Sequence, residues 1–113
     1  MNIQIFGKKK CFETKKAERY FKERGIKFQR IALEEKGLSK GEFNSVRANV
    51  KILDELIDYN SKSDTATLIK YLSIESDKVE KLLENPMLFK TPIVRNGKAA
   101  TVGYCPDIWK TWE

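Results

Sequence analysis

Apolar and polar residues alternate near the start of the chain, over residues 2–6, and again over residues 26–33. Alternation of this kind predicts two β-strands, each with one buried face. Between them, residues 12–24 repeat apolar side chains at helical spacing, and Gly25 follows as a C-terminal glycine. The apolar positions of that helix are Phe12, Ala17, Tyr20 and Phe21. We therefore expect a strand–helix–strand unit with parallel strands and a right-handed crossover.

The middle of the chain predicts a series of short helices. Ser39-Lys40-Gly41-Glu42 has the pattern of a capping box and opens a helix that is expected to reach about Val50. Further apolar faces at helical spacing follow between residues 52 and 83, and Asn85-Pro86 ends the last of them. Residues 36–88 are therefore expected to form a helical insertion.

A β-hairpin is predicted near the C-terminus, because Asn96-Gly97 separates two segments that favour strands, residues 92–95 and 98–102. A short helix follows, with Pro106 at its first position. The complete pattern predicts an α/β fold with a mixed four-stranded sheet, in the order β-α-β, helical insertion, β-β-α. We expect residues 1–113 to form a single domain.

The composition is that of a small protein with one hydrophobic core. The chain has 113 residues, 41% of them hydrophobic, which is enough for a core without disulfides or metals. It contains no histidine, which excludes Cys-His and Ser-His-Asp catalysis and imidazole metal ligands. Its two cysteines lie far apart and cannot build a zinc site by themselves, so we expect no metal. No apolar run has the length of a membrane span and no signal-peptide pattern is present, which favours a cytoplasmic location.

The net charge of +6 makes nucleic acid a partner to consider. Basic and acidic residues nevertheless alternate along most of the chain, as in Glu18-Arg19 and Lys22-Glu23-Arg24. Such alternation is typical of a solvated helical surface with ion pairs one turn apart. We therefore expect neither nucleic acid nor a membrane as a partner.

The strongest candidate for chemistry is Cys11, which stands between the first strand and the first helix. Reactive groups of α/β proteins gather at such strand ends, and a helix N-terminus favours the thiolate form of a cysteine. Lys10 and Lys15 supply nearby positive charge, and the hydroxyl of Thr14 can donate to the sulfur. The alternative is a buried cysteine that acts as a small apolar residue. The run of lysines at residues 8–10 argues against burial, so we favour a reactive thiol.

Three motifs together resemble the arsenate reductase-like (ArsC/Spx/YffB) family of the thioredoxin superfamily, over essentially the whole chain. They are Cys11-Phe12-Glu13-Thr14 with Lys15-Lys16-Ala17, then Lys90-Thr91-Pro92-Ile93-Val94, then Val102-Gly103-Tyr104. The resemblance implies a thioredoxin-like fold with a helical insertion and a nucleophile at Cys11. It also implies a cis peptide bond before Pro92, which would face the cysteine, with backbone groups of Thr91 positioning a thiol substrate by strand-like pairing. Without the resemblance, Pro92 would be read as an ordinary trans proline at a strand start.

Two departures from the family pattern narrow the function. Spx regulators and many other relatives carry a Cys-x-x-Cys pair, but here Thr14 takes the place of the second cysteine, which implies monothiol chemistry. Arsenate reductases that use glutathione hold the oxyanion with arginines, whose positions fall near Asp58, at Thr91 and near Cys105. None of these is arginine, and Arg47 is only a distant candidate. The missing guanidinium groups argue against arsenate reduction.

Cys105 is placed by the expected topology on the same side of the sheet as Cys11. With one strand between them, two strand spacings separate the cysteines by about 10 Å, beyond the roughly 7 Å between Cα atoms that a disulfide spans. A bridge would therefore need a loop movement. We favour a packed cysteine and leave a second redox thiol as the alternative.

These observations favour a thiol-dependent oxidoreductase with Cys11 as its nucleophile. The resemblance implies no bound cofactor, glutathione or another low-molecular-weight thiol as co-substrate, and glutaredoxin or thioredoxin as a reducing partner. The alternatives are an Spx-like regulator that binds RNA polymerase and a family member that has lost catalysis.

Overall fold

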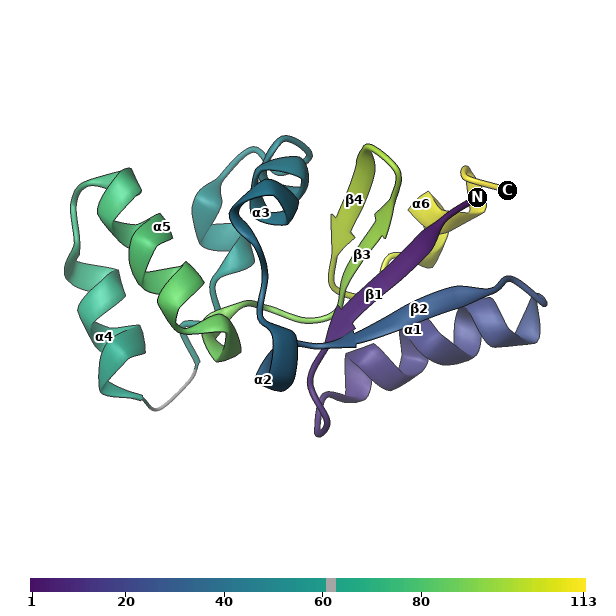
Figure 1. Ribbon diagram of the computed structural model, residues 1–113, viewed down its shortest axis with the longest axis horizontal. Coiled ribbons are helices and arrows are strands. Elements are labelled where there is room, and N and C mark those ends of the chain that lie inside the picture. Colours follow the sequence, from purple (N-terminus) through teal and green to yellow (C-terminus); the bar gives the residue numbers. More distant parts are fainter. Residues whose placement is uncertain (61–62) are drawn as a thin grey trace.

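The computed structural model describes residues 1–60 and 63–113. Its single sheet has the order β2-β1-β3-β4 (Figure 1). The strands are β1 (Ile3–Gly7), β2 (Phe28–Ala32), β3 (Ile93–Asn96) and β4 (Ala99–Val102). β1 and β2 are parallel, whereas β3 is antiparallel to both β1 and β4. The predicted mixed sheet, with one parallel pair and one hairpin, is confirmed.

The helices form two groups. α1 and α6 follow β1 and β4 and lie beside the sheet, whereas the others lie between β2 and β3 and extend away from it (Figure 1). The helices are α1 (Phe12–Glu23), α2 (Leu33–Lys36), α3 (Lys40–Arg47), η1 (Leu53–Leu56), α4 (Asp64–Tyr71), α5 (Glu75–Glu84), η2 (Pro86–Leu88) and α6 (Pro106–Lys110). The expected helical insertion is therefore present, although its residues 61–62 lie outside the described residues. No helix among the described residues is long and apolar enough to cross a membrane.

The sheet separates two hydrophobic clusters, because side chains alternate along β1. Ile3 and Ile5 pack with α1 and with Trp109 of α6, whereas Phe6 packs with the insertion. The indole N–H of Trp109 donates to Thr101 Oγ1 at 2.8 Å, so the buried indole and the buried hydroxyl each have a hydrogen-bond partner. Both faces of the sheet are thus fixed by packing.

Helix α1 ends as predicted, with Gly25 at a φ of 66° and Ile26 N–H donating to the Phe21 carbonyl at 2.9 Å. Its buried side chains lie at helical spacing. The prediction was wrong for Phe12, which is 80% exposed. At the first helical position the side chain points away from the sheet, so an apolar residue there contributes nothing to the core.

The capping box of α3 is confirmed, with Ser39 and Glu42 each accepting from the other's backbone N–H. The helix ends at Arg47 instead of reaching Val50, because the Arg47 guanidinium donates to the Val50 carbonyl and the chain turns back there. The following Asn49 amide donates to the Lys98 carbonyl at 2.8 Å, at the tip of the hairpin. This contact holds the end of α3 over β4.

A second contact ties the insertion to the segment that enters β3. Lys90 N–H donates to the Leu56 carbonyl at 2.9 Å, and Asp58 N–H donates to the Leu88 carbonyl at 2.7 Å. Between them, Ile57 and Phe89 form an isolated antiparallel bridge. The insertion therefore has a fixed position beside Thr91 and forms one wall of the candidate site.

Candidate active site around Cys11

Cys11 is the N-cap residue of α1, directly after the loop that leaves β1. Its N–H donates to the Lys8 carbonyl at 3.2 Å. The Lys9 N–H donates to the carboxylate of Glu34, on α2, at 2.8 Å. The sequence alone did not identify Glu34 as a partner of this loop. Because α2 directly follows the parallel partner of β1, the contact fixes the lysine loop beside the cysteine.

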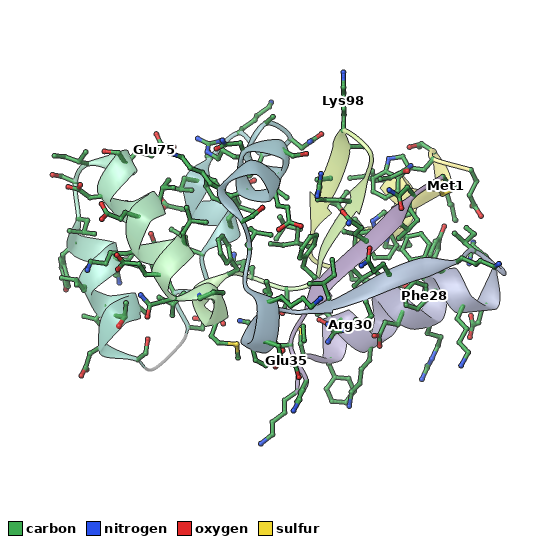
Figure 2. The ribbon with its side chains drawn as sticks, viewed as in Figure 1. Met1, Phe28, Arg30, Glu35, Glu75 and Lys98 are labelled. Carbon is green, nitrogen blue, oxygen red and sulfur yellow. The ribbon has the colours of Figure 1, made fainter. Side chains whose placement is uncertain are left out.

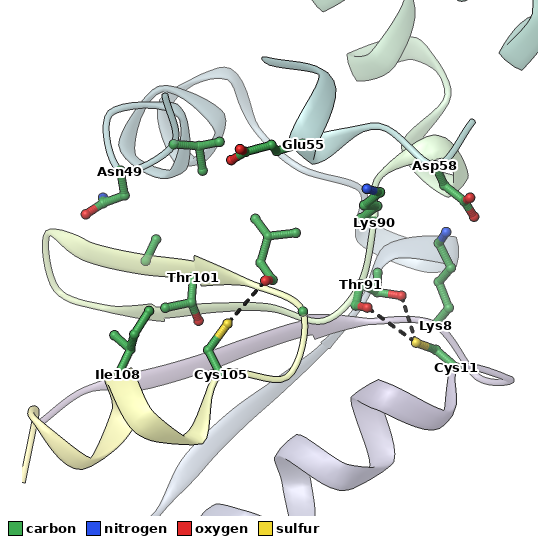
Figure 3. A pocket seen from close by; sticks show the side chains of 14 residues that line it. Lys8, Cys11, Asn49, Glu55, Asp58, Lys90, Thr91, Thr101, Cys105 and Ile108 are labelled. Carbon is green, nitrogen blue, oxygen red and sulfur yellow. Dashed lines mark hydrogen bonds between the residues drawn. The ribbon is translucent and has the colours of Figure 1, made fainter. Parts of the chain in front are cut away.

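The Cys11 sulfur lies against Thr91 (Figure 3). Thr91 Oγ1 donates to Cys11 Sγ at 2.9 Å, and the neutral thiol can donate to the Thr91 carbonyl at 3.6 Å. The Thr91–Pro92 peptide bond is cis, as the family resemblance implied. The structure therefore brings Cys11 together with Thr91 and Pro92. Cys11 and Thr91 are in contact although they lie 80 residues apart in the sequence.

The electrostatic surroundings of Cys11 favour the thiolate. Partial burial raises the pKa of the thiol, but the nearby hydroxyls of Thr14 and Thr91 and the N–H groups of Thr14 and Glu13 lower it by more. The net effect is a pKa below the ordinary thiol value. The reading of Cys11 as a reactive thiol thus has a local physical basis.

Thr14 is buried in the first turn of α1, and its hydroxyl has no hydrogen-bond partner of good geometry among the described residues. It nevertheless favours the Cys11 thiolate, which is a stronger acceptor than the neutral thiol. The Thr14 side chain is positioned by Gly7, where an added Cβ would lie only 2.3 Å from Thr14 Cγ2. The end of β1 therefore requires glycine for Thr14 to pack as it does.

The lysines near Cys11 differ in their burial and in which of the two hollows beside Cys11 they line. Lys8 is half-buried and lines both hollows that contain Cys11. Burial lowers the pKa of Lys8, although the charges of Asp58, Cys11 and Glu34 act to raise it. Lys10 is exposed and lines only the smaller hollow, and Lys15 is exposed and lines neither. Lys8, which sequence reasoning did not single out, is therefore the lysine most closely associated with the sulfur.

A groove of about 640 Å³ runs between the strand ends and the insertion, and both cysteines line it (Figure 3). The expectation that Cys105 lies on the Cys11 side of the sheet is confirmed. Cys105 Sγ donates to the Val102 carbonyl at 3.3 Å, and both thiols are free. Burial raises the pKa of the Cys105 thiol, with Thr101 partly opposing it. The two cysteines therefore share a groove but differ in the direction in which their pKa values are shifted.

None of the described residues that line this groove is arginine, although Asp58, Thr91 and Cys105 all line it. Arg47 binds Glu75 through Nη2 at 2.9 Å. Figure 2 shows Glu75 on the part of the insertion away from the sheet. Arg47 is thus engaged elsewhere. The described residues also contain no cluster of three or more His, Cys, Asp or Glu side chains that could hold a metal ion.

Comparisons with known proteins find relatives of this chain in sequence. The model of the ArsC family matches residues 6–112. The global transcriptional regulator Spx 2 of Oceanobacillus iheyensis is 32% identical over 114 residues, a match that covers 95% of this chain and 80% of that protein.

Solved structures share the fold at low sequence identity. An arsenate reductase from Vibrio cholerae superposes with a TM-score of 0.83 at 19% identity, covering 96% of this chain and 94% of that one. The glutaredoxin-like NrdH-redoxin of Escherichia coli gives a TM-score of 0.53 at 15% identity, covering 100% of this chain and 96% of that one. The predicted thioredoxin-like fold is therefore confirmed.

Proposed function

Because the chain belongs to the ArsC family, we propose that it is a thiol-dependent oxidoreductase with Cys11 as its only redox nucleophile. The observation that supports this proposal best is the hydrogen bond from Thr91 Oγ1 to Cys11 Sγ, at 2.9 Å beside an open groove. A hydroxyl donor at the sulfur stabilises negative charge both before attack and when the sulfur leaves again. A free, unbridged pair of cysteines fits a reducing compartment, so we propose a cytoplasmic location.

The proposed reaction begins with the Cys11 thiolate attacking one sulfur of a disulfide. A new S–S bond forms between Cys11 and that sulfur, and the original S–S bond breaks. Its second sulfur leaves as a thiolate and takes a proton from solvent. A second thiol then attacks the mixed disulfide, which releases the Cys11 thiolate and produces a new disulfide. The oxidising equivalents thus come from one disulfide and pass to another.

Thr91 and Pro92 are proposed to position the substrate. The N–H of Thr91 makes no hydrogen bond with any described residue, so it is free to pair with the backbone of a peptide-like thiol. Lys10 is proposed to add positive charge at the rim, and the same role for Lys15 rests on sequence proximity alone. Thr14 takes the place of a resolving cysteine, so an external thiol must complete the cycle. We propose glutathione or another small thiol for that role, with glutaredoxin or thioredoxin as reducing proteins.

The proposal does not include arsenate as the principal substrate. A tetrahedral oxyanion is bound best by bidentate guanidinium groups, and none lines the groove among the described residues. Lysines supply charge without that planar geometry.

The test is thiol–disulfide exchange by the wild-type protein and by Cys11→Ser and Cys105→Ser. The mass of the intact protein reports the mixed disulfide, and alkylation at several pH values reports each thiol separately. We expect rapid exchange in the wild type and in Cys105→Ser, and none in Cys11→Ser. Exchange that survives in Cys11→Ser would refute the proposal. A Cys11 that titrates like an ordinary thiol and forms no mixed disulfide would identify a family member without catalysis.

A second function is favoured by the 32% identity to a protein named a global transcriptional regulator. In that case we propose that the chain binds RNA polymerase, and that its Cys11 serves as a sensor or has no role. Affinity capture with purified RNA polymerase, using the wild type and Cys11→Ser, separates the two functions. Tight binding that is independent of Cys11, together with absent exchange, would support the regulator.

A further inference from the structure

We propose that a hollow between α1 and residues 104–110 binds a diphosphate group, carried by a nucleotide or by an inorganic polyphosphate. The hollow has a volume of about 520 Å³ and shares no lining residue with the two hollows beside Cys11. The inference is therefore independent of the proposed redox function. Two separate observations support it: an excess of positive charge in the lining, and a buried tyrosine hydroxyl without a hydrogen-bond partner among the described residues.

Basic side chains dominate the lining of this hollow. Among the described residues that line it, only Glu23 is acidic, whereas the basic ones are Lys16, Arg19, Arg24 and Lys110. The first three of these lie on α1 or at its C-cap. At a rise of 1.5 Å per residue, Lys16 and Arg24 are separated by about 12 Å along the helix axis. Cations spread over that length match two linked phosphate groups better than a single one.

Two of these cations have no anionic partner in the fold. Arg19 and Lys110 make no ion pair within 4.0 Å with a described residue. Lys16 lies 3.7 Å from the carboxylate of Glu13, but both side chains are about half exposed, and such pairs contribute little. Asp107, on the first turn of α6, is exposed and does not line the hollow. The lining can therefore accept a ligand with several negative charges.

The hydroxyl of Tyr20 is the second observation. Tyr20 is only 5% exposed and lines the hollow, yet its hydroxyl oxygen has no hydrogen-bond partner among the described residues. A buried tyrosine hydroxyl normally has a partner, because leaving it unpaired costs free energy. Burial raises the pKa of Tyr20, although the charge of Arg24 opposes this shift. The hydroxyl therefore keeps its proton and can donate to an anionic oxygen.

Arg24 lies over the ring of Tyr20 and would move when the ligand binds. Its Cζ is 3.9 Å from the ring centroid, and its only ion-pair partner among the described residues is Glu113, at 3.7 Å. A guanidinium group binds phosphate through two parallel N–H donors, which is a stronger interaction than an exposed ion pair of that length. A bound diphosphate would therefore draw Arg24 away from the ring and accept a hydrogen bond from the Tyr20 hydroxyl.

The test is a titration of the ¹⁵N-labelled protein with pyrophosphate at constant ionic strength, followed by the backbone amide signals. ADP, inorganic phosphate and citrate are titrated in the same way. We expect pyrophosphate and ADP to bind about ten-fold more tightly than inorganic phosphate or citrate, because they place two phosphate groups against the guanidinium and ammonium groups. Tighter binding of ADP than of pyrophosphate would identify a nucleotide as the source of the diphosphate, and the reverse order would identify inorganic polyphosphate.

Variants test each part of the site separately. Tyr20→Phe keeps the ring and removes only the unpaired hydroxyl, so it should weaken pyrophosphate binding about ten-fold while leaving the urea unfolding midpoint of the free protein equal or higher. Tyr71→Phe removes an exposed hydroxyl from α4 and is the matched control. Arg19→Gln and Lys110→Gln should each weaken binding about two- to five-fold, the effect of losing one exposed ion pair. Lys70→Gln makes the same charge change on an exposed position of α4, outside the hollow, and should leave binding unaltered.

The outcomes separate a built site from general attraction to a basic protein. Amide shifts that gather on α1 and α6, together with weaker binding in Tyr20→Phe, would support the proposal. No detectable binding, equal affinity for citrate, or equal losses in Lys110→Gln and Lys70→Gln would refute it. Disulfide exchange at Cys11, measured in the same variants, should be unchanged, so the diphosphate site and the proposed redox function can each fail without the other.

Discussion

Replacing Thr91 with valine should reduce the reactivity of Cys11 while leaving the sulfur in place. Valine has nearly the shape of threonine but lacks the hydroxyl that donates to Cys11 Sγ at 2.9 Å. A hydrogen bond to a charged acceptor contributes about 1.5–3 kcal/mol, and the lower end applies because Cys11 is only partly buried. A loss of about 1.5 kcal/mol corresponds to roughly tenfold less thiolate at a pH below the thiol pKa.

The direction of the pKa shift follows from which form of the Cys11 thiol the Thr91 hydroxyl stabilises. Thr91 Oγ1 lowers the pKa of Cys11 by favouring the thiolate, so its removal raises that pKa and shifts the alkylation profile to higher pH. The assay is the rate of iodoacetamide reaction between pH 5 and 10, measured on the Cys11 peptide by mass spectrometry. At pH 6 the variant should react about tenfold more slowly, and at pH 10 the two rates should converge.

Thr91→Ser is the matched control, because it keeps a hydroxyl at the same position. Its profile should lie close to that of the wild type. Alkylation of Cys105 in the same samples controls for a general change in the groove, since the Cys105 sulfur donates to Val102 and makes no contact with Thr91. An unshifted profile in Thr91→Val, or equal shifts in the valine and serine variants, would refute the assigned role of the hydroxyl.

Three further predictions test the surroundings of the site. Gly7→Ala should destabilise the protein by about 1–3 kcal/mol in urea unfolding and slow Cys11 alkylation, because the new Cβ would lie 2.3 Å from Thr14 Cγ2. Ser39→Ala should cost about 1 kcal/mol by removing the cap of α3, without altering alkylation. Burial and the Asp54 carboxylate raise the pKa of Tyr59 to about 12, so the stability that Tyr59 adds relative to Tyr59→Phe should be full below pH 10 and be lost as the pH rises through 12. Equal pH profiles of unfolding for those two proteins would contradict the last prediction.

The order of the elements could be predicted from the sequence because each carries a local signal. Gly25 ends α1, and the capping box starts α3. Asn96-Gly97 forms the hairpin turn, with Gly97 at a φ of 60°. The errors lie at the ends of helices, where spacing alone does not fix whether a position is helical or buried. Phe12 has the spacing of a core residue yet is exposed.

Cys11 could also be singled out from the sequence as the candidate nucleophile, because the end of a strand, the start of a helix and a run of lysines are adjacent there. The contact between its sulfur and Thr91 could not be assigned from spacing alone, since the two residues lie 80 positions apart in the sequence. Only the family resemblance connected the two segments before the structure was known. The three adjacent lysines had a similar ambiguity. They predict positive charge near the thiol, but the contact between Lys9 N–H and Glu34 decides how the loop is held beside the groove.

The position of Glu55 in the lining of the groove had no local signal in the sequence. Glu55 is one of 16 acidic residues, and nothing in its neighbours distinguishes it from Asp54. What separates them is tertiary structure: Asp54 is bound by Tyr59 and Lys78, whereas the pairing of Leu56 with Lys90 places Glu55 at the groove. The surroundings of the Cys11 sulfur therefore depend on the strand–helix junction and on Thr91, and the opposite wall of the groove depends on how the insertion is attached. Because the bridge between Ile57 and Phe89 holds the insertion beside Thr91, changes elsewhere in the insertion should reshape the groove without moving Cys11 or Thr91.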